Sequence, residues 1–408
     1  MALAPCRLEI KISTITKHTA MTTTKHDVPI HGTCAPEFST VRAAFERNFR
    51  ERAEVGAAVC VYKDGKKVVD LWGGHKDAAR TKPWDKDTIV IMNSVAKSMS
   101  ALCMHILIDR GKVDFDAPVA TYWPEFAQAG KDKVLVRHVL SHTCGVIFCD
   151  AASPGSIYRW DEQIHAIEKQ TPAWEPGTTG AYNAENIGFL LGEVVRRVTG
   201  RTIGTFLREE VSDKLGADYH IGLTPDEIER VTDMHQNPKN KFFEVAADTS
   251  TPLGRACKCA PLGYFQNDRE IRELEVPSFG GHGNARAMAR IYAMLAGNGE
   301  IDNVRLLSPQ AVVRLSTLVW DHDCIMTKQR MRMGYGFMQN ETETVPMGRN
   351  INAFGHTGTG GAFTWADRES NMSYCYVTNF QREGPGIGPR SAAPSVAAGG
   401  GRKPLWLS

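Results

Sequence analysis

Short apolar runs separated by polar turns predict β-strands toward both ends of the chain. Residues 56–62 are small or β-branched, and Lys63-Asp64-Gly65-Lys66 separates them from a second apolar run at 68–72. An Asp-Gly pair between two apolar runs is a strong hairpin signal. Two further apolar runs, at 354–365 and 371–379, flank a polar turn and predict another antiparallel pair.

Helical periodicity appears between these two regions. Apolar residues recur at 95, 99, 102, 103, 106 and 107, and Gly111 follows the run. The segment has few charges, so we expect a helix that is buried on most of its circumference. The pattern predicts further helices at 187–198, with Gly200 as a C-cap, and at 286–295.

The order of these elements predicts an α+β fold, in which an antiparallel sheet assembled from both chain ends is flanked by helices. We expect an α/β lobe formed by residues 36–112 and 280–380, with a helical lobe of residues 113–279 inserted between them. Residues 1–35 are predicted to be a flexible leader. Residues 381–408 hold ten Gly or Pro and show no periodicity, which predicts a disordered tail.

Charge and composition exclude several classes of partner. Lys and Arg total 48 against 46 Asp and Glu, so no basic excess indicates binding to nucleic acid or to a membrane surface. Most of the ten cysteines stand singly in apolar contexts, which favours a reducing compartment. No run approaches the ~18 apolar residues of a spanning helix, and the first twenty residues contain no apolar stretch of the length that a secretory signal needs. We therefore expect a cytoplasmic protein, with Met21 as an alternative start; the sequence does not fix its oligomeric state.

The motif Ser94-Val-Ala-Lys97 stands at the start of the predicted buried helix. Side chains at i and i+3 share one helix face, so the amine can accept the serine proton. The free N–H groups of a helix N-terminus also favour developing negative charge. Alone, this motif usually marks a serine cap with a solvated lysine. Here the helix is too apolar for a surface lysine, and a buried lysine needs a partner or a lowered pKa.

Two other segments could contribute to a site. Tyr182-Asn183-Ala184 lies just before a predicted helix, where a loop tyrosine can reach a neighbouring site, although a lone tyrosine is more often a core residue. His356-Thr-Gly-Thr-Gly-Gly361 has an unusual density of glycine. Glycine on a strand permits close approach of a ligand or of another backbone, or marks a bulge.

Together the three segments resemble the serine β-lactamase and penicillin-binding-protein superfamily, whose motifs are S-x-x-K, a Tyr motif and K-T-G. Within it, the sequence is similar to the bacterial family VIII carboxylesterases over residues 38–379. The similarity includes Leu140-Ser-His-Thr-Cys-Gly145, Trp174-Glu-Pro-Gly177 and Gly280-Gly-His-Gly-Asn284. It implies a β-lactamase/transpeptidase-like fold and a serine carboxylesterase that hydrolyses short-acyl esters through an acyl-enzyme, without metal or cofactor.

The resemblance also implies a role for each matching residue. Ser94 would be the nucleophile and Lys97 its base, while Tyr182 would relay the proton to the leaving alcohol and then activate water. The backbone N–H groups of Ser94 and Thr359 would form the oxyanion hole. The substrate-binding residues that it implies are Asn183, His356 and Gly358.

Two departures from the superfamily pattern favour a neutral ester over a penicillin. Ala184 stands where class C β-lactamases have an asparagine that binds the amide of the drug, and His356 replaces the lysine that pairs with its carboxylate. Among enzymes, the alternatives are a β-lactamase or D,D-peptidase and an acyltransferase that uses an alcohol in place of water. Outside enzymes, the alternative is a non-catalytic binding protein of the same fold.

Two other hydrolase classes fit the sequence poorly. An α/β-hydrolase needs the motif G-x-S-x-G, and no serine in this chain has a glycine both two positions before it and two positions after it. A metal site could use His138, His142 and Cys144, but Val139 stands where the zincin motif has glutamate, and Cys257-Lys-Cys259 is more simply a pair of ordinary thiols.

Overall fold

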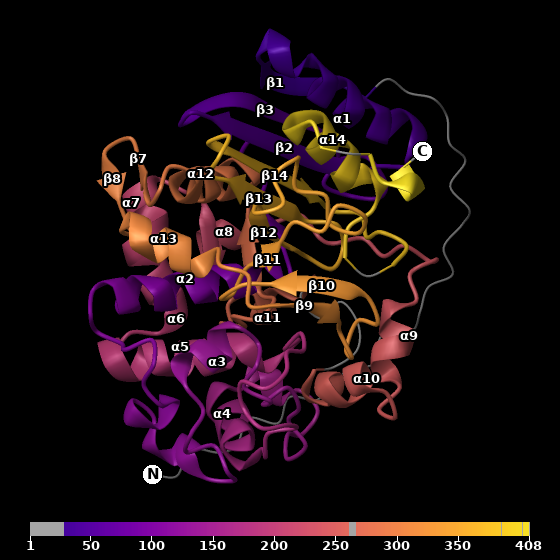
Figure 1. Cartoon of the computed structure of the whole chain (residues 1–408). Helices are drawn as coiled ribbons and strands as arrows, with labels where there is room; N and C mark the ends of the chain where they lie inside the picture. The colour runs from indigo at the N-terminus through magenta and orange to yellow at the C-terminus, as the bar shows by residue number, and fades with distance from the viewer. Residues whose placement is uncertain (1–27, 261–266, 385, 402, 408) are drawn as a thin grey trace.

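The computed structural model describes residues 28–260, 267–384, 386–401 and 403–407. Its main sheet consists of β1 (Ile30–Cys34), β2 (Gly56–Lys63), β3 (Lys66–Gly74), β9 (Trp320–Asp323), β10 (Arg330–Met333), β11 (Met338–Gln339), β12 (Phe354–Thr357), β13 (Phe363–Asp367) and β14 (Met372–Thr378). The spatial order is β1-β3-β2-β14-β13-β12-β11-β10-β9, and every neighbouring pair is antiparallel (Figure 1). Strands from the two chain ends meet where β2 pairs with β14, with Cys60 opposite Cys375.

The helices are α1 (Ser39–Glu51), α2 (Val95–Asp109), α3 (Val136–Leu140), α4 (Trp160–Lys169), α5 (Asn186–Thr199), α6 (Ile203–Leu207), α7 (Asp213–Leu215), α8 (Pro225–Ile228), α9 (Phe242–Ala247), α10 (Pro252–Ala256), α11 (Arg269–Arg272), α12 (Ala285–Ala296), α13 (Pro309–Leu315) and α14 (Pro389–Gly399). Smaller sheets join β4 (Val90–Ile91), β6 (Gly281–Gly283) and β5 (Tyr219–Ile221), and β7 (Glu300–Ile301) with β8 (Val304–Arg305).

Helices cover both faces of the main sheet. Alternate residues of a strand point to opposite faces, so each strand contributes apolar side chains to both interfaces. Val59 and Val61 of β2 belong to the same hydrophobic cluster as residues of α1 and α14. Ala58 and Cys60 point the other way and join a cluster that contains the apolar face of α12. The α+β fold with a flanked antiparallel sheet is therefore confirmed, as are the predicted hairpin of β2 and β3 and the helix α12.

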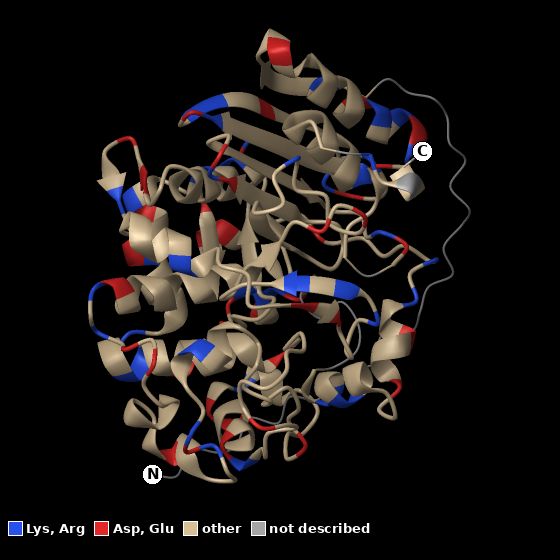
Figure 2. Cartoon of the chain, in the orientation of Figure 1, with Lys and Arg blue, Asp and Glu red and all other residues tan. Residues whose placement is uncertain are grey.

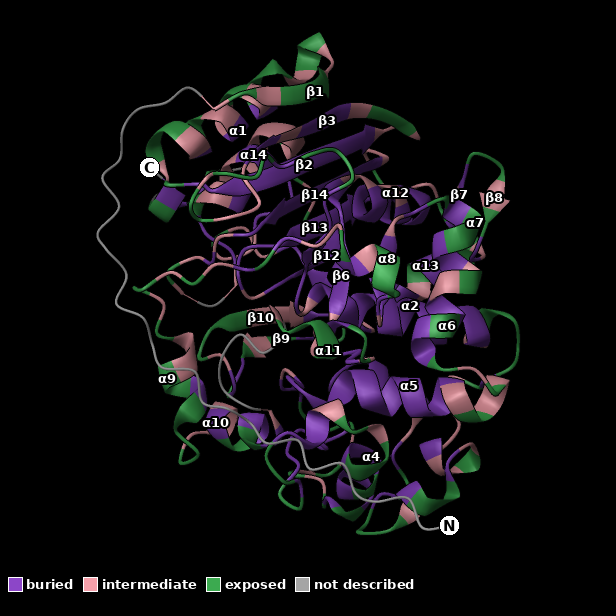
Figure 3. Cartoon of the chain, turned by 180° about the vertical axis from the view of Figure 1, so that it is seen from behind, coloured by how far each residue is buried: buried purple, intermediate pink, exposed green. Residues whose placement is uncertain are grey.

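Helix α2 is the centre of the helical part of the molecule. Every residue from Val95 to Leu107 is buried, and α2 packs against α5, so both helices lie largely in the interior (Figure 3). Helix α5 ends at Gly200, which has a left-handed φ of 71°, as the predicted C-cap requires. The larger hydrophobic cluster runs through α2, α5 and the α12 side of the sheet without interruption. The division into lobes at residues 112 and 280 stays a prediction.

The apolar run at 354–365 forms two strands rather than one. The Gly358 amide donates to the Ala362 carbonyl at 2.7 Å, and the Gly361 amide donates to the Gly358 carbonyl at 3.0 Å, which turns the chain back on itself. Gly361 has a φ of 121°, which residues with a side chain rarely adopt. The predicted antiparallel pair is therefore β13 with β14, and β12 is an additional strand beside β13.

Two predictions about the chain ends need correction. In the predicted leader, residues 1–27 lie outside the described residues, but Ile30–Cys34 forms the edge strand β1 on β3. The predicted disordered tail contains helix α14, which packs on α1 and β14. Small residues let this helix approach the sheet closely: Ser395 accepts a hydrogen bond from Trp365 Nε1 at 2.8 Å, and the Ser391 carbonyl accepts one from the Tyr374 hydroxyl at 2.8 Å.

Within the described part of the chain, the structure contains no helix that is long and apolar enough to span a membrane.

Candidate active site

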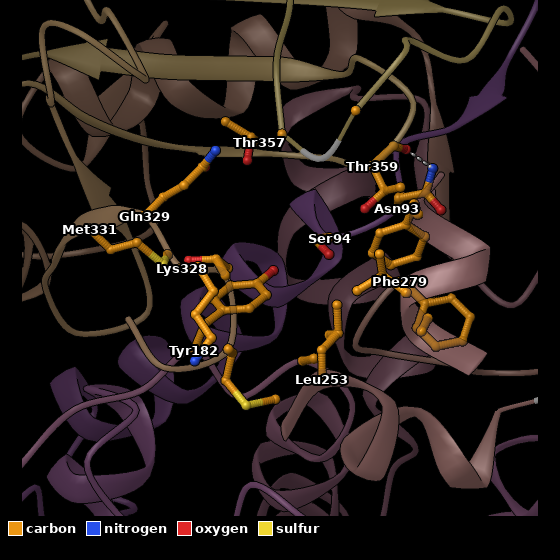
Figure 4. A pocket seen from close by; sticks show the side chains of 18 of the residues that line it. Asn93, Ser94, Tyr182, Leu253, Phe279, Lys328, Gln329, Met331, Thr357 and Thr359 are labelled. Carbon is orange, nitrogen blue, oxygen red and sulfur yellow. Dashed lines mark hydrogen bonds between the residues drawn. The ribbon is translucent and has the colours of Figure 1, made fainter. Parts of the chain in front are cut away.

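Ser94 lies at a sharp turn between strand β4 and helix α2. The preceding residue, Asn93, has a left-handed φ of 47°, a conformation that asparagine tolerates better than most residues. The Met92 amide donates to the Gly281 carbonyl at 2.8 Å and fixes the strand side of the turn. Ser94 occupies the N-cap position of α2 and faces a cavity (Figure 4).

Lys97 reaches Ser94 from one turn further along the helix. Its Nζ donates to Ser94 Oγ at 3.0 Å and to the Ser278 carbonyl at 2.8 Å. The side chain is only 1% exposed. Burial lowers the pKa of Lys97 to about 8, although the nearby Glu185 carboxylate acts in the opposite direction. A substantial fraction of Lys97 is therefore neutral in mildly alkaline solution and able to accept a proton.

Tyr182 lies on the other side of Ser94, between two imidazole rings. The His142 ring stacks on it with centroids 5.6 Å apart and the His356 ring lies 6.2 Å away, while Lys97 Nζ is 5.2 Å from the centroid of the Tyr182 ring. Burial raises the pKa of Tyr182, and its contact with the Ser94 side chain opposes this only in part. The phenol is therefore a neutral donor near pH 7.

Thr359 approaches Ser94 from the turn that follows β12. The Asn93 side-chain amide donates a hydrogen bond to the Thr359 carbonyl, and Asn93, Ser94 and Thr359 all line the cavity (Figure 4). Gly358, the residue before Thr359, lies so close to the β4 end that a Cβ there would be 2.1 Å from the Met92 carbonyl oxygen. Glycine at this position is what allows the two segments predicted to form the oxyanion hole to meet.

The cavity has a volume of about 480 Å³. Helices α9 and α10, the turn between β9 and β10, and the loop before β6 supply its apolar walls. These walls include Val245, Leu253, Phe279, Met326, Met331 and Met338. Charges of both signs surround this region (Figure 2), and two of the cations at the rim are paired: Lys241 with Glu244 at 2.9 Å and Arg330 with Asp321 at 2.8 Å.

Asn183 does not face this cavity, so its predicted contact with substrate needs correction. Its side-chain amide donates to the Val146 carbonyl at 3.0 Å, and its side-chain oxygen accepts from the Asn186 amide at 3.0 Å. The residue is fully buried and holds the start of α5 against the loop that follows α3. Its hydrogen-bonding groups are therefore used within the protein.

His356 and Gly358 also lie outside the cavity wall. His356 is fully buried behind Tyr182, and its Nδ1 is 2.7 Å from the Thr357 carbonyl oxygen. Burial lowers the pKa of His356 to about 3, so the imidazole is neutral at physiological pH. Gly358 serves the close approach to Met92 described above.

Most residues that line the cavity were absent from the sequence-based prediction, among them Asn93, Glu185 and Phe279. Asn93 could have been noticed as an asparagine immediately before the serine, where a strand turns into a helix. Glu185 follows the Tyr182 motif directly, and a glutamate in such an apolar stretch is a signal of a buried charge. Phe279 carries no local signal, because it reaches the site only through the fold.

The described residues contain no group of three or more His, Cys, Asp or Glu side chains placed to hold a metal ion. Of the residues considered for a metal site, His142 instead stacks on Tyr182, and its Nδ1 accepts a hydrogen bond from the Asn183 amide at 2.9 Å.

Ser94 has a buried lysine one helical turn away and faces a tyrosine beside an antiparallel sheet. This arrangement defines a serine hydrolase of the β-lactamase-like fold. The Beta-lactamase family model matches residues 42–394, and the chain belongs to this family. The predicted membership of the serine β-lactamase and penicillin-binding-protein superfamily, on its esterase side, is thereby confirmed.

Known proteins agree with this assignment. Esterase/beta-lactamase LipL of Mycobacterium tuberculosis is 32% identical over 87% of this chain and 85% of its own length. Esterase EstB of Burkholderia gladioli is 27% identical over 55% of this chain and 62% of its own. The crystal structure of a family VIII carboxylesterase superposes with a TM-score of 0.84 and 36% identity, covering 91% of this chain and 99% of that one.

Proposed function

We propose that this protein is a serine carboxylesterase that hydrolyses neutral, short-acyl carboxylic esters through an acyl-enzyme on Ser94. The observation that supports this most strongly is the 3.0 Å hydrogen bond from Lys97 Nζ to Ser94 Oγ at the wall of a cavity that Tyr182 also lines. An ester is small enough for the cavity of about 480 Å³, and its carbonyl carbon would lie beside Ser94.

The proposed reaction starts with neutral Lys97, which takes the proton from Ser94 Oγ as the oxygen attacks the ester carbonyl. The N–H groups of Ser94 and Thr359 stabilise the resulting oxyanion. The intermediate collapses when the bond to the leaving oxygen breaks and Tyr182 donates a proton to that oxygen, with Lys97 returning its proton to the tyrosine. Water then attacks the acyl carbonyl carbon and passes a proton through Tyr182 to neutral Lys97. As the bond to Ser94 Oγ breaks, Lys97 returns that proton to Ser94 and the acid is released.

The preference for a neutral ester rests on two positions. Ala184 lines the cavity without an amide group, and His356 is neutral and turned away from it. Neither offers a β-lactam the hydrogen bond or the cation that its amide and carboxylate need. β-Lactam hydrolysis is a second, weaker candidate activity, because the relative LipL is named both an esterase and a β-lactamase. The predicted cytoplasmic location stays a prediction.

The test compares kcat/KM for p-nitrophenyl butyrate and nitrocefin in the wild type, Ala184→Asn and His356→Lys. We expect the wild type to prefer the ester by about 100-fold and Ala184→Asn to gain nitrocefin turnover, since a neutral hydrogen bond contributes about 0.5–1.5 kcal/mol and one to a charged group about 1.5–3 kcal/mol. A wild type that prefers nitrocefin, or no gain in either variant, would show that these positions do not set the preference.

A further inference from the structure

Glu185 places a carboxylate in the wall of the catalytic cavity. The residue is 8% exposed. Its Oε1 accepts a hydrogen bond from the Cys257 thiol at 3.5 Å, and its Oε2 has no hydrogen-bond partner among the described residues. A buried carboxylate with so few hydrogen bonds is unfavourable unless a nearby opposite charge compensates it.

Ser278 connects this carboxylate-bearing residue to Lys97. The Ser278 carbonyl accepts the hydrogen bond from Lys97 Nζ at 2.8 Å, while its Oγ donates to the Glu185 carbonyl and accepts from the Gly188 amide at 3.0 Å. One residue therefore holds the lysine on α2 and the backbone of Glu185 at the start of α5. Their side chains line the same cavity.

The two side chains act on each other electrostatically. Burial raises the pKa of Glu185 and lowers the pKa of Lys97, and each charge opposes this in part: the Lys97 ammonium lowers the pKa of Glu185, and the Glu185 carboxylate raises the pKa of Lys97. Each thus favours the charged form of the other.

The other titratable groups that interact electrostatically with this pair are uncharged near neutral pH, and among the described residues the charged ones elsewhere in the cavity wall, such as Lys241 and Arg330, are not among the groups that act on Lys97 or Glu185. The uncharged groups come from several neighbouring elements and are Tyr158, Tyr182, Cys257, Cys259, His142 and His356. Burial raises the pKa of the phenols and thiols and lowers the pKa of the imidazoles. Among the described residues, Glu185 is therefore the only carboxylate that acts on Lys97.

We propose that Glu185 is a positioning residue of the catalytic site, whose carboxylate stabilises the ammonium form of Lys97 and so sets the pH above which Lys97 acts as a base. The inference rests on the proposed function, because it concerns the same proton transfer. When Lys97 takes the proton from Ser94, the positive charge forms in the same cavity wall as the Glu185 carboxylate. The proton then leaves through Tyr182.

The experiment measures kcat/KM for p-nitrophenyl butyrate from pH 5.5 to 10, followed at a wavelength where the absorbance of the product does not depend on pH. It compares the wild type with Glu185→Gln, which removes the charge at constant size, and with Glu185→Asp, which keeps the charge but draws it back by one methylene. Glu229→Gln is the matched control, since it removes the same charge from an exposed side chain whose ion-pair partner, Arg269, does not line the cavity.

Because Glu185→Gln removes the charge that favours the ammonium, we expect its acid limb to move to lower pH by about one unit. Glu185→Asp should move the limb in the same direction by less, and Glu229→Gln should reproduce the wild-type profile. A folded Glu185→Gln with an unchanged acid limb would overturn the inference. If Glu185→Gln does not fold, the Asp variant decides in the same way, and an unmoved limb again overturns it. A wild type that hydrolyses no ester would instead contradict the proposed function.

Discussion

The docking of helix α14 can be tested at a buried ion pair between the two ends of the fold. Arg390, in the first turn of α14, donates from Nη1 to Glu54 Oε1 at 2.9 Å and from Nη2 to the Phe380 carbonyl at 2.7 Å. The Glu54 side chain is 0% exposed and also accepts hydrogen bonds from the hydroxyls of Thr378 and Tyr376. The substitution Arg390→Ala leaves this carboxylate buried without its cation.

The expected loss of stability follows from that burial. Removing one partner of a buried pair costs about 3–5 kcal/mol. An unfolding entropy of ~2.1 cal/mol/K per residue gives ~0.86 kcal/mol/K for a chain of 408 residues. Dividing the loss of stability by the unfolding entropy predicts a fall in Tm of about 4–6 °C.

Thermal unfolding followed by circular dichroism measures this change. The control is Arg47→Ala, because Arg47 and Glu51 are about half exposed and such a surface pair contributes little to stability. Adding Glu54→Gln to Arg390→Ala should recover part of the loss by removing the unpaired charge. If Arg390→Ala shifts Tm no more than Arg47→Ala does, α14 does not dock through this pair and the reasoning fails.

Three further predictions concern the site. Lys97→Ala and Tyr182→Phe should each reduce kcat nearly as much as the double variant, because the two share one proton path; additive losses in ΔΔG‡ would contradict this. Since neutral Lys97 is the proposed base and burial lowers its pKa to about 8, kcat/KM should fall about tenfold per pH unit below that value, and a flat profile from pH 6 to 8 would exclude it as the titrating group. Asn93→Gly keeps the left-handed backbone but removes the amide that holds the Thr359 carbonyl, so kcat should fall by about 10-fold or more; unchanged kcat would show that the hydrogen bond does not position the oxyanion hole.

Much of the fold follows from local patterns in the sequence. Helix α2 combines a long apolar periodicity with a terminal glycine, and the β2–β3 hairpin combines two apolar runs with an Asp-Gly turn. Both signals lie within about twenty residues of chain. The convergence of Ser94, Lys97 and Tyr182 required the resemblance to a known family, because Tyr182 is 88 positions away from Ser94 in the sequence.

The errors arose where tertiary packing decides the structure. Helix α14 is rich in proline and small residues, which predict disorder when they are considered alone. In the folded protein, Pro389 lies in the first turn, where its missing N–H is tolerated, and Ser391 and Ser395 accept hydrogen bonds from aromatic residues of the sheet. The resemblance assigned Asn183 to substrate binding, but its side-chain amide donates to the loop that follows α3. The partners in these hydrogen bonds lie 17 to 37 positions away in the sequence, beyond the reach of a local pattern.

The central claim, that Ser94 is the nucleophile, is tested most directly by intact-mass spectrometry after treatment with a fluorophosphonate. The wild type should gain a single adduct that maps to the peptide containing Ser94, and Ser94→Ala should gain none and should lose ester hydrolysis. An adduct on another residue, or ester hydrolysis retained by Ser94→Ala above a few per cent of the wild-type rate, would contradict the account.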